Sequence, residues 1–291
     1  MPSGLPAPEP ATLPVPVHAG SVGRWLAGTS LLSGIASAGA ALAGVTVPAS
    51  WLVGTGAAMA ASVAAGVAWQ GSGVFARPLL AVRTSRPELA LTFDDGPDPR
   101  FTPAVLELLA AHHQRATFFV IGERAQAHPE LLEAIVRGGH ALGNHSWRHT
   151  YTTNLIAPRR LAEELRQTNA LLERATGQST RWFRAPVGLL SPRLAAAVRL
   201  AELQLVGWSA SARDGVAART VEDAVRRLEP SLRPGAILTL HDGALGGRAQ
   251  VIAPQVLARV LERMAARGLR SVTLDSLLSP SSPGSAAPGA S

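Results

Sequence analysis

The sequence predicts an α/β fold, a distorted, short (β/α) barrel of about seven parallel strands, preceded by an N-terminal apolar helical hairpin. Strand and helix patterns alternate seven times after residue 86, and such alternation implies parallel strands joined by right-handed crossovers. Ionisable residues stand where these strands end, and a long uncharged run precedes them. The barrel unit, residues 87–278, is shorter than the roughly 250 residues of a complete eight-stranded barrel. We therefore expect an irregular barrel.

The uncharged run at the front of the chain predicts helices that cross a membrane. No Asp, Glu, Lys, Arg or His occurs in residues 25–76, whereas roughly 20 apolar residues are enough to span a bilayer. We predict a transmembrane hairpin over 24–76, with two spans at about 25–47 and 51–69. The spans divide at Pro48, because proline disfavours helix at the residue before it.

Other interpretations of this run stay open. A cleaved signal peptide has an apolar region of typically ~7–15 residues, far shorter than this one. A buried helical subdomain is also compatible with so much glycine and alanine. Arg24 precedes the run and Arg77 follows it, and positive charge on both flanks places both ends in the cytoplasm if there are two spans. With a single span the domain could lie outside, so orientation is open.

The elements of the barrel unit follow from apolar periodicity and from turn residues. Proline stands at several predicted helix starts and glycine at several ends, as helix termini favour. We predict strands over 89–93, 116–121, 140–145, 182–184, 203–208, 236–240 and 271–274, and helices over 102–113, 129–137, 158–176, 191–201, 221–228 and 254–267. The proline-rich residues 1–23 are predicted as a flexible tail, and the Ser/Pro/Gly/Ala-rich residues 279–291 as a disordered one.

Composition excludes several classes of protein. The chain has no cysteine, which excludes disulfide scaffolds, cysteine nucleophiles and thiolate metal sites. Hydrophobic residues make up 47% and charged residues 16%, so the chain is not a disordered protein. The net charge is +7 and every basic residue is arginine, but the arginines are dispersed rather than clustered with aromatic residues. We therefore expect no nucleic-acid partner.

The predicted strands deliver polar side chains to one rim. A barrel collects site residues from the carboxyl ends of many strands, whereas an open sheet uses a few at a switch point. Five strand ends carry candidates here, which favours the barrel. They are Asp94 and Asp95, then His145 and His149, then Arg184, then Trp208 with Asp214 soon after it, and finally His241 and Asp242.

These residue types fit metal-assisted hydrolysis. Two adjacent carboxylates repel each other unless a cation or proton intervenes, although Asp-Asp-Gly-Pro is also good turn chemistry. His145 and His149, at i and i+4, can join one carboxylate around a single ion and leave coordination positions open. Such an ion polarises a carbonyl and lowers the pKa of bound water. The other carboxylate can then accept the proton of that water.

The remaining candidates suit the later part of such a reaction. His241 can protonate a leaving amine, and Asp214 or Asp242 could orient its imidazole. Arg184 would hold the base ionised, since a neighbouring cation favours the charged carboxylate. Candidate substrate contacts are Pro186, Trp208 and Leu240, of which the last two could form a slot for a small acyl methyl group, unless they simply pack at strand ends.

Four segments carry a resemblance to a known family. Residues 92–97 (TFDDGP), 145–149 (HSWRH), 184–188 (RAPVG) and 238–242 (LTLHD) resemble, in order, signatures of the polysaccharide deacetylase (NodB-homology, carbohydrate esterase family four) domain. The resemblance covers about 87–278. It implies a distorted (β/α) barrel and a metal-dependent hydrolase that removes N- or O-acetyl groups from glycans.

The resemblance also implies a role for each site residue. The first Asp of the pair, Asp94, would be the base, and Arg184 would orient it. The second Asp and the two histidines, Asp95, His145 and His149, would bind one divalent ion, zinc or another transition metal such as cobalt. The late histidine, His241, would be the acid, with Asp214 as its partner. Many relatives carry an aromatic residue where this chain has Val187.

The leading hypothesis is therefore a bacterial inner-membrane deacetylase of amino-sugar glycans such as peptidoglycan or chitin-like oligosaccharides. Residues 25–69 would contact the membrane, and no protein partner can be read from the sequence. One alternative is a deacylase or deformylase of a lipid-linked amino sugar, which the side of the membrane that the domain faces would distinguish. Another is a non-catalytic glycan-binding protein, which predicts an incomplete set of metal ligands or acid.

Overall fold

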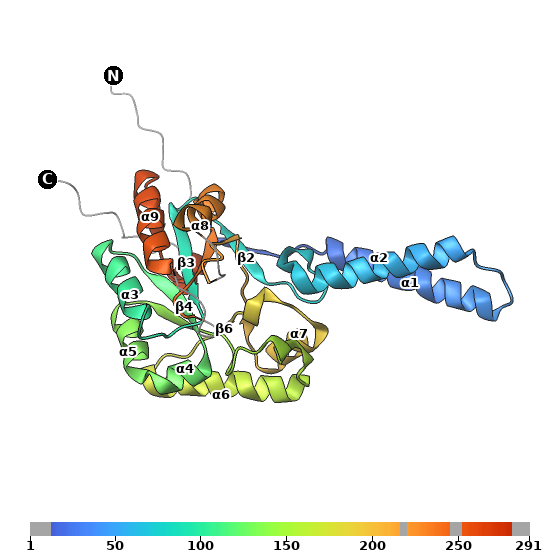
Figure 1. Cartoon of the computed structure of the whole chain (residues 1–291), viewed down its shortest axis with the longest axis horizontal. Helices are drawn as coiled ribbons and strands as arrows, with labels where there is room; N and C mark the ends of the chain where they lie inside the picture. The colour runs from blue at the N-terminus through green and yellow to red at the C-terminus, as the bar shows by residue number, and fades with distance from the viewer. Residues whose placement is uncertain (1–12, 216–219, 245–251, 281–291) are drawn as a thin grey trace, which may run out of the picture.

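The computed structural model describes residues 13–215, 220–244 and 252–280. It consists of an α/β unit and a helical hairpin that projects from one side of it (Figure 1). The hairpin is formed by α1 (Val22–Leu42) and α2 (Ala49–Ala68), which pack along each other, and the short 3₁₀ helix η1 (Gln70–Ser72) follows it. The predicted hairpin is thus present as two helices.

The sheet of the α/β unit is a curled row of parallel strands in the order β7-β6-β5-β4-β3-β9-β8, and β10 pairs with β3. The two ends of the row, β7 and β8, do not pair with each other in the described part of the chain, so the barrel is incomplete, as predicted. The strands are β3 (Glu88–Asp94), β4 (Ala116–Val120), β5 (Ala141–Asn144), β6 (Trp182–Phe183), β7 (Gln204–Leu205), β8 (Ala210–Ser211), β9 (Ile237–His241) and β10 (Arg270–Ser271).

Helices cover the outer face of this sheet (Figure 1). They are α3 (Thr102–Ala111), α4 (Gly122–Ala127), α5 (Pro129–Arg137), α6 (Pro158–Thr176), α7 (Pro192–Leu200), α8 (Val221–Leu228) and α9 (Ala253–Ala266). The short helix α10 (Leu274–Leu278) packs instead in the same cluster as Ala90 and Trp182. The 3₁₀ helices of this unit are η2 (Tyr151–Leu155), η3 (Pro186–Gly188) and η4 (Glu229–Ser231). Strand side chains alternate between two faces. Leu91 and Phe93 therefore pack in the outer core with α3 and α9, whereas Ala90 lies in a separate inner cluster with Trp182.

A strand before residue 87 lies across the opening of the sheet. In β2 (Leu79–Arg83), Leu79 bridges Val206 in parallel and Ala81 bridges Ala236 in antiparallel fashion, so β2 connects the end of the edge strand β7 with the start of β9. It also pairs with β1 (Val15–His18). Two boundaries are therefore corrected: the folded unit begins before residue 87, and part of the predicted tail 1–23 is a strand. Residues 1–12 and most of the predicted tail 279–291 lie outside the described residues.

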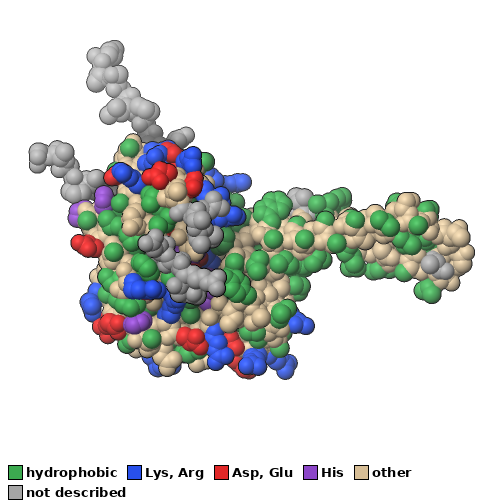
Figure 2. All heavy atoms as spheres, in the orientation of Figure 1, with side chains coloured by type: hydrophobic (Ala, Val, Ile, Leu, Met, Phe, Trp, Pro, Cys, Tyr) green, Lys and Arg blue, Asp and Glu red, His purple; other side chains and the backbone are tan. Residues whose placement is uncertain are grey.

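The hairpin exposes apolar side chains along its length, and no charged side chain is visible on most of the projecting arm (Figure 2). Trp25 and Trp69, near its base, are 69% and 65% exposed. Among the described helices, α2 is the one long and apolar enough to cross a membrane by length and composition. Of the two predicted spans, α2 alone meets this criterion among the described helices, and two spans stay a prediction.

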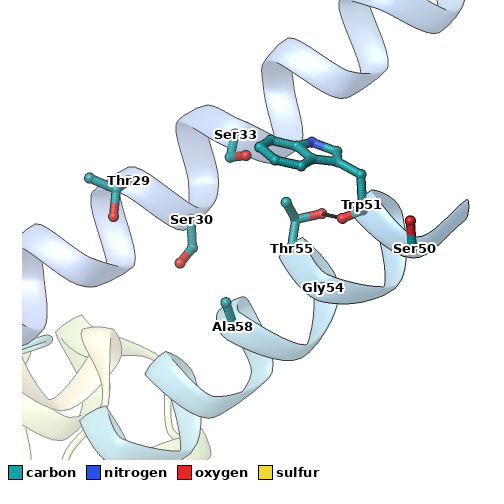
Figure 3. A pocket seen from close by; sticks show the side chains of 8 residues that line it. All are labelled: Thr29, Ser30, Ser33, Ser50, Trp51, Gly54, Thr55 and Ala58. Carbon is teal, nitrogen blue, oxygen red and sulfur yellow. Dashed lines mark hydrogen bonds between the residues drawn. The ribbon is translucent and has the colours of Figure 1, made fainter. Parts of the chain in front are cut away.

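A hydroxyl-lined groove of about 330 Å³ lies between the hairpin helices (Figure 3). The hydroxyls of Ser30 and Thr55 donate to carbonyls of their own helices, 2.9 and 3.0 Å away. Trp51 Nε1 donates to Ser37 Oγ of the facing helix (2.9 Å). These hydrogen bonds engage the hydroxyls of Ser30 and Thr55 and the indole of Trp51 within the hairpin itself.

Candidate active site

The site lies where the parallel strands end. Asp94, the last residue of β3, is in register with His241, the last residue of β9. On the other side of β3, Val120 of β4 is in register with Asn144 of β5, which is followed directly by His145. Parallel strands end at one rim of the sheet, so residues far apart in sequence meet there.

Asp95, His145 and His149 form a buried cluster at this rim. The Nε2 atoms of His145 and His149 lie 3.3 and 3.2 Å from Asp95 Oδ1. One donor atom from each residue lies within 4.8 Å of the other two, close enough for one ion. The structure thus brings together all three predicted metal ligands.

The local backbone explains how these side chains converge. Asp95, Ser146 and His149 have φ of 71°, 67° and 52°, values that L-residues rarely adopt and that concentrate at functional sites. Asn144 Oδ1 accepts from the amide of Ser146 (2.9 Å), and Ser146 Oγ accepts from the amide of His149 (3.1 Å). These two hydrogen bonds fold the 145–149 segment into a tight turn that directs both imidazoles to Asp95.

The chemistry of the cluster fits a divalent cation. Asp95 Oδ1 is buried without a well-formed hydrogen bond. Burial raises the pKa of Asp95, but the neighbouring histidines, His145 first, outweigh this and hold the pKa at about 2. Burial, together with His145, lowers the pKa of His149 to about 4, which leaves its imidazole neutral. His145 Nδ1 lies 2.9 Å from the carbonyl oxygen of Arg184. Because a carbonyl can only accept, the ring proton sits on Nδ1, and Nε2 keeps its lone pair for a metal.

Asp94 faces a different partner. Arg184 is fully buried and donates through Nη1 to Asp94 Oδ1 and to Thr92 Oγ1, both at 2.7 Å. Its Nη2 donates to the carbonyl of Gly207 (2.9 Å), and its guanidinium carbon lies 4.1 Å from the ring centre of Phe119. Burial lowers the pKa of Arg184, but a guanidinium remains charged in proteins. The pair therefore fixes a carboxylate beside the metal-ligand cluster.

His241 is held by Asp214, one of the two residues predicted as candidates to orient its imidazole. Its Nδ1 lies 2.8 Å from Asp214 Oδ1, and its amide donates to Asp214 Oδ2 (3.1 Å). Burial lowers the pKa of His241, but Asp214, followed by Asp95 and Asp94, raises it to about 10. The imidazole is therefore protonated at neutral pH and can donate a proton.

Asp242, the other candidate partner, does not contact this imidazole through a hydrogen bond. Its Oδ2 accepts from Thr102 Oγ1 (2.6 Å), and burial raises its pKa to about 7. The alternative in which Asp242 orients His241 is therefore wrong. The reason is strand geometry: successive residues at the end of β9 point in opposite directions.

The same alternation corrects one predicted substrate contact. Leu240 precedes His241 and belongs to the outer core with residues of α9, so it does not line the site. Trp208 lies near the site, with its ring centre 5.7 Å from the guanidinium carbon of Arg184. Pro186 is buried in η3, directly after the Arg184 strand end.

Several residues at the site were not predicted from the sequence. Thr92 and Asn144 orient Arg184 and the 145–149 turn, and Arg124 donates to the carbonyl of Asp95 (2.8 Å). Thr92 could have been found, because it stands two residues before Asp94 on the same strand face. Gln70, which contacts the loop after Arg184 from outside the barrel, has no sequence signal.

The comparisons with known proteins agree with this geometry. A family model described as polysaccharide deacetylase matches residues 81–206. The chain is 35% identical to a peptidoglycan-N-acetylglucosamine deacetylase of Bacillus cereus, over 65% of this chain and 87% of that protein. It is also 35% identical to a chitooligosaccharide deacetylase of Azorhizobium caulinodans, over 64% of this chain and 92% of that protein.

A solved structure has the same fold. A family 4 acetyl xylan esterase from Clostridium thermocellum, in complex with a cobalt ion, matches with a TM-score of 0.59 and 31% identity, over 65% of this chain and 89% of that chain. The motifs, the curled parallel sheet and the two relatives agree. The chain is a member of the polysaccharide deacetylase family, with a NodB-homology domain of carbohydrate esterase family four.

Proposed function

We propose that this protein is a metal-dependent hydrolase that removes N-acetyl groups from an amino-sugar glycan such as peptidoglycan or a chitin-like oligosaccharide. The observation that carries the proposal is the convergence of three units at one rim: the Asp95–His145–His149 cluster, the Asp94–Arg184 pair and the His241–Asp214 pair. The two named relatives, which act on peptidoglycan and chitooligosaccharides, support this class of substrate.

Each unit has a separate chemical task. A divalent ion held by Asp95, His145 and His149 would supply Lewis-acid polarisation of the acyl carbonyl, and the two-nitrogen, one-oxygen donor set suits zinc, with cobalt as another transition metal of similar preference. Asp94 accepts the proton of the attacking water, while Arg184 holds this carboxylate in place. His241 protonates the leaving amine, and Asp214 orients its ring.

We also propose that the hairpin anchors the enzyme in the inner membrane of a bacterium. The uncharged surface of the hairpin and its tryptophans at the base support this, because Trp is enriched at membrane–water interfaces. A 20-residue helix such as α2 is about 30 Å long, which matches the hydrocarbon thickness of a bilayer.

A second substrate is favoured by one observation. The end of α2 contacts the loop that follows Arg184, so the site lies beside the base of the hairpin. A lipid-linked amino sugar, held at the membrane surface, would be presented at this position. The non-catalytic alternative predicts an incomplete set of groups. The convergence of the residues proposed as ligands, base and acid favours the catalytic function instead.

The experiment that tests the proposal measures acetate and formate release from a panel of soluble and lipid-linked amino sugars. We expect acetate release from at least one N-acetylated substrate, abolished by a chelator and restored by zinc or cobalt. Formate release from the lipid-linked member alone would assign the second substrate instead. Acetate release that a chelator does not affect would contradict metal dependence.

A further inference from the structure

The end of the hairpin contacts the loop formed by residues 184–190 at two points. The amide of Leu190 donates to the carbonyl of Val67, near the end of α2 (3.0 Å). Gln70, in the 3₁₀ helix that follows α2, donates through Nε2 to the carbonyl of Gly188 (3.3 Å). The hairpin therefore forms part of the wall beside Arg184.

The side chain of Gln70 lies between two glycines. A Cβ atom added to Gly188 would come within 2.4 Å of Gln70 Nε2, and one added to Gly207 within 2.2 Å of Gln70 Oε1. Both distances are far below van der Waals contact, so only glycine at these positions leaves room for the amide. Gly188 also has φ of 70°, which favours glycine independently.

The same two glycines belong to the segments that hold Arg184. Gly188 ends the 3₁₀ turn that follows Arg184 in the chain, and the carbonyl of Gly207 accepts from Arg184 Nη2 (2.9 Å). Arg184 in turn bonds to Asp94. A side chain that sets the spacing of these two segments therefore sets the position of the guanidinium.

The orientation of Gln70 is fixed by the hydrogen bond to Gly188. Only the amino group of the amide can face a carbonyl, so Oε1 is left on the side of Gly207. There it is buried without a hydrogen-bond partner, an arrangement that costs free energy. An apolar side chain would avoid this buried oxygen but would lose the hydrogen bond to Gly188, so the amide does more than fill space.

We infer that Gln70 is a positioning residue for the deacetylation: it fixes the spacing between Gly188 and Gly207 and, through them, holds Arg184 against Asp94. The inference rests on the proposed function, in which Asp94 is the base. It gives the segment that follows the hairpin an indirect part in the active site, independent of any contact with a membrane.

The test compares full-length variants on a soluble N-acetylated chitooligosaccharide. We expect Gln70→Ala to lower kcat about tenfold, because small displacements of positioning groups have effects of this size or more, with KM within about twofold and metal content unchanged. Gln167→Ala, at an exposed position of α6, is the matched control and keeps wild-type kcat. Wild-type kcat in Gln70→Ala would overturn the inference.

A double-mutant cycle separates positioning from general destabilisation. Gly207→Ala should lower kcat strongly in the wild-type background, because its Cβ meets Gln70 Oε1 and, less closely, Leu80 Cδ2. The loss should be smaller in the Gln70→Ala background, where the closer of the two clashes is removed. Additive effects would overturn the inference.

Amide exchange gives a readout that does not depend on turnover: residues 185–190 should exchange faster in Gln70→Ala, and unchanged exchange would also overturn it. Absence of acetate release from the wild-type protein would instead remove the proposed function.

Discussion

Asp94 and Asp95 are neighbours in the chain but serve different partners. Asp94 ends β3 and faces Arg184, whereas the left-handed backbone of Asp95 turns its carboxylate to the two histidines. Asp tolerates this conformation better than most residues because its short polar side chain can bond locally. Two identical residue types thus acquire separate roles from one change in backbone direction.

This separation predicts different outcomes for the two carboxylates. Asp94→Asn should retain bound metal but lose at least about a hundredfold in kcat, since proton transfer contributes factors of this size. Asp95→Ala and His145→Ala should lose both metal and activity, as measured by metal analysis and acetate release. His112→Ala, at an exposed position after α3, is the histidine control and should keep both. Full activity in Asp94→Asn would disprove its role as base.

The His241–Asp214 pair predicts a pH dependence. The protonated imidazole is the acid, so activity falls as pH rises through its pKa of about 10. Asp214→Asn removes the largest influence that raises this pKa, and the basic limb of the kcat profile should move down by about 1–3 pH units. An unchanged basic limb would contradict the assignment.

The same pair also links pH to stability. Because the pKa of His241 is raised above its ordinary 6.5, the contribution of the pair to stability is complete below that pH and is lost as pH rises to about 10. Wild-type protein should therefore become easier to unfold across this range, and Asp214→Asn should show a weaker dependence.

At the scale of elements, helices with clear end signals were predictable. The predicted bounds of α5, α6 and α8 agree with the structure, and Pro129, Pro158 and Gly177 mark three of these ends. The predicted strand 271–274 ends early because Thr273 caps α10: its hydroxyl accepts from the amide of Ser276 (3.2 Å). The apolar pattern alone predicted a longer strand, but the N-cap hydrogen bond of Thr273 begins a helix at this point.

The strands that sequence reasoning missed, β1, β2 and β8, depend on distant partners. β2 pairs with β1 and bridges Val206 and Ala236, none of which is close to it in the chain. β8 has two residues, too few for any periodicity. Such elements exist because the open edges of a curled sheet need partners, a requirement that a local pattern does not contain.

The cap of α7 gives a test at this scale. Ser191 Oγ accepts from the amide of Leu194 (3.1 Å) at the point where the 184–190 loop becomes helix. Ser191→Ala should lower the free energy of unfolding by about 1 kcal/mol, measured by urea denaturation. Ser179→Ala, in an exposed turn, should leave it unchanged. Equal stability of both variants would show that the cap contributes nothing.

At the scale of the whole molecule, the motifs predicted which residues meet but not how the hairpin joins them. The metal ligands, Arg184 and His241 stand at strand ends, and parallel strands bring such ends together whatever their separation in the chain. The prediction that Leu240 contacts the substrate was wrong, because Leu240 points into the outer core whereas the next residue, His241, points to the opposite face of the sheet. Gln70 carries no motif, since its position depends on how the hairpin meets the barrel.

The β1–β2 pairing predicts the topology of the proposed anchor. It places the chain before α1 beside the chain after α2, so a membrane-inserted hairpin enters and leaves on the same side. The chain has no native cysteine, so a thiol reagent would label only the introduced residue in each single-cysteine variant. Exposed positions Ser21→Cys and Ser85→Cys should react from one side, and Thr46→Cys, in the turn, from the other. Labelling of Ser21→Cys and Ser85→Cys from opposite sides would contradict this arrangement.

The turn between the hairpin helices has a further consequence for how the protein would reach its site of action. Whatever that turn carries must pass through hydrocarbon when a hairpin inserts, and each charged residue there adds roughly 2.5–3.5 kcal/mol on translocon scales. From Trp25 to Ala76 there is no ionic group to carry across. If the proposed anchor inserts as a hairpin, no charged side chain of residues 25–76 has to cross the hydrocarbon core.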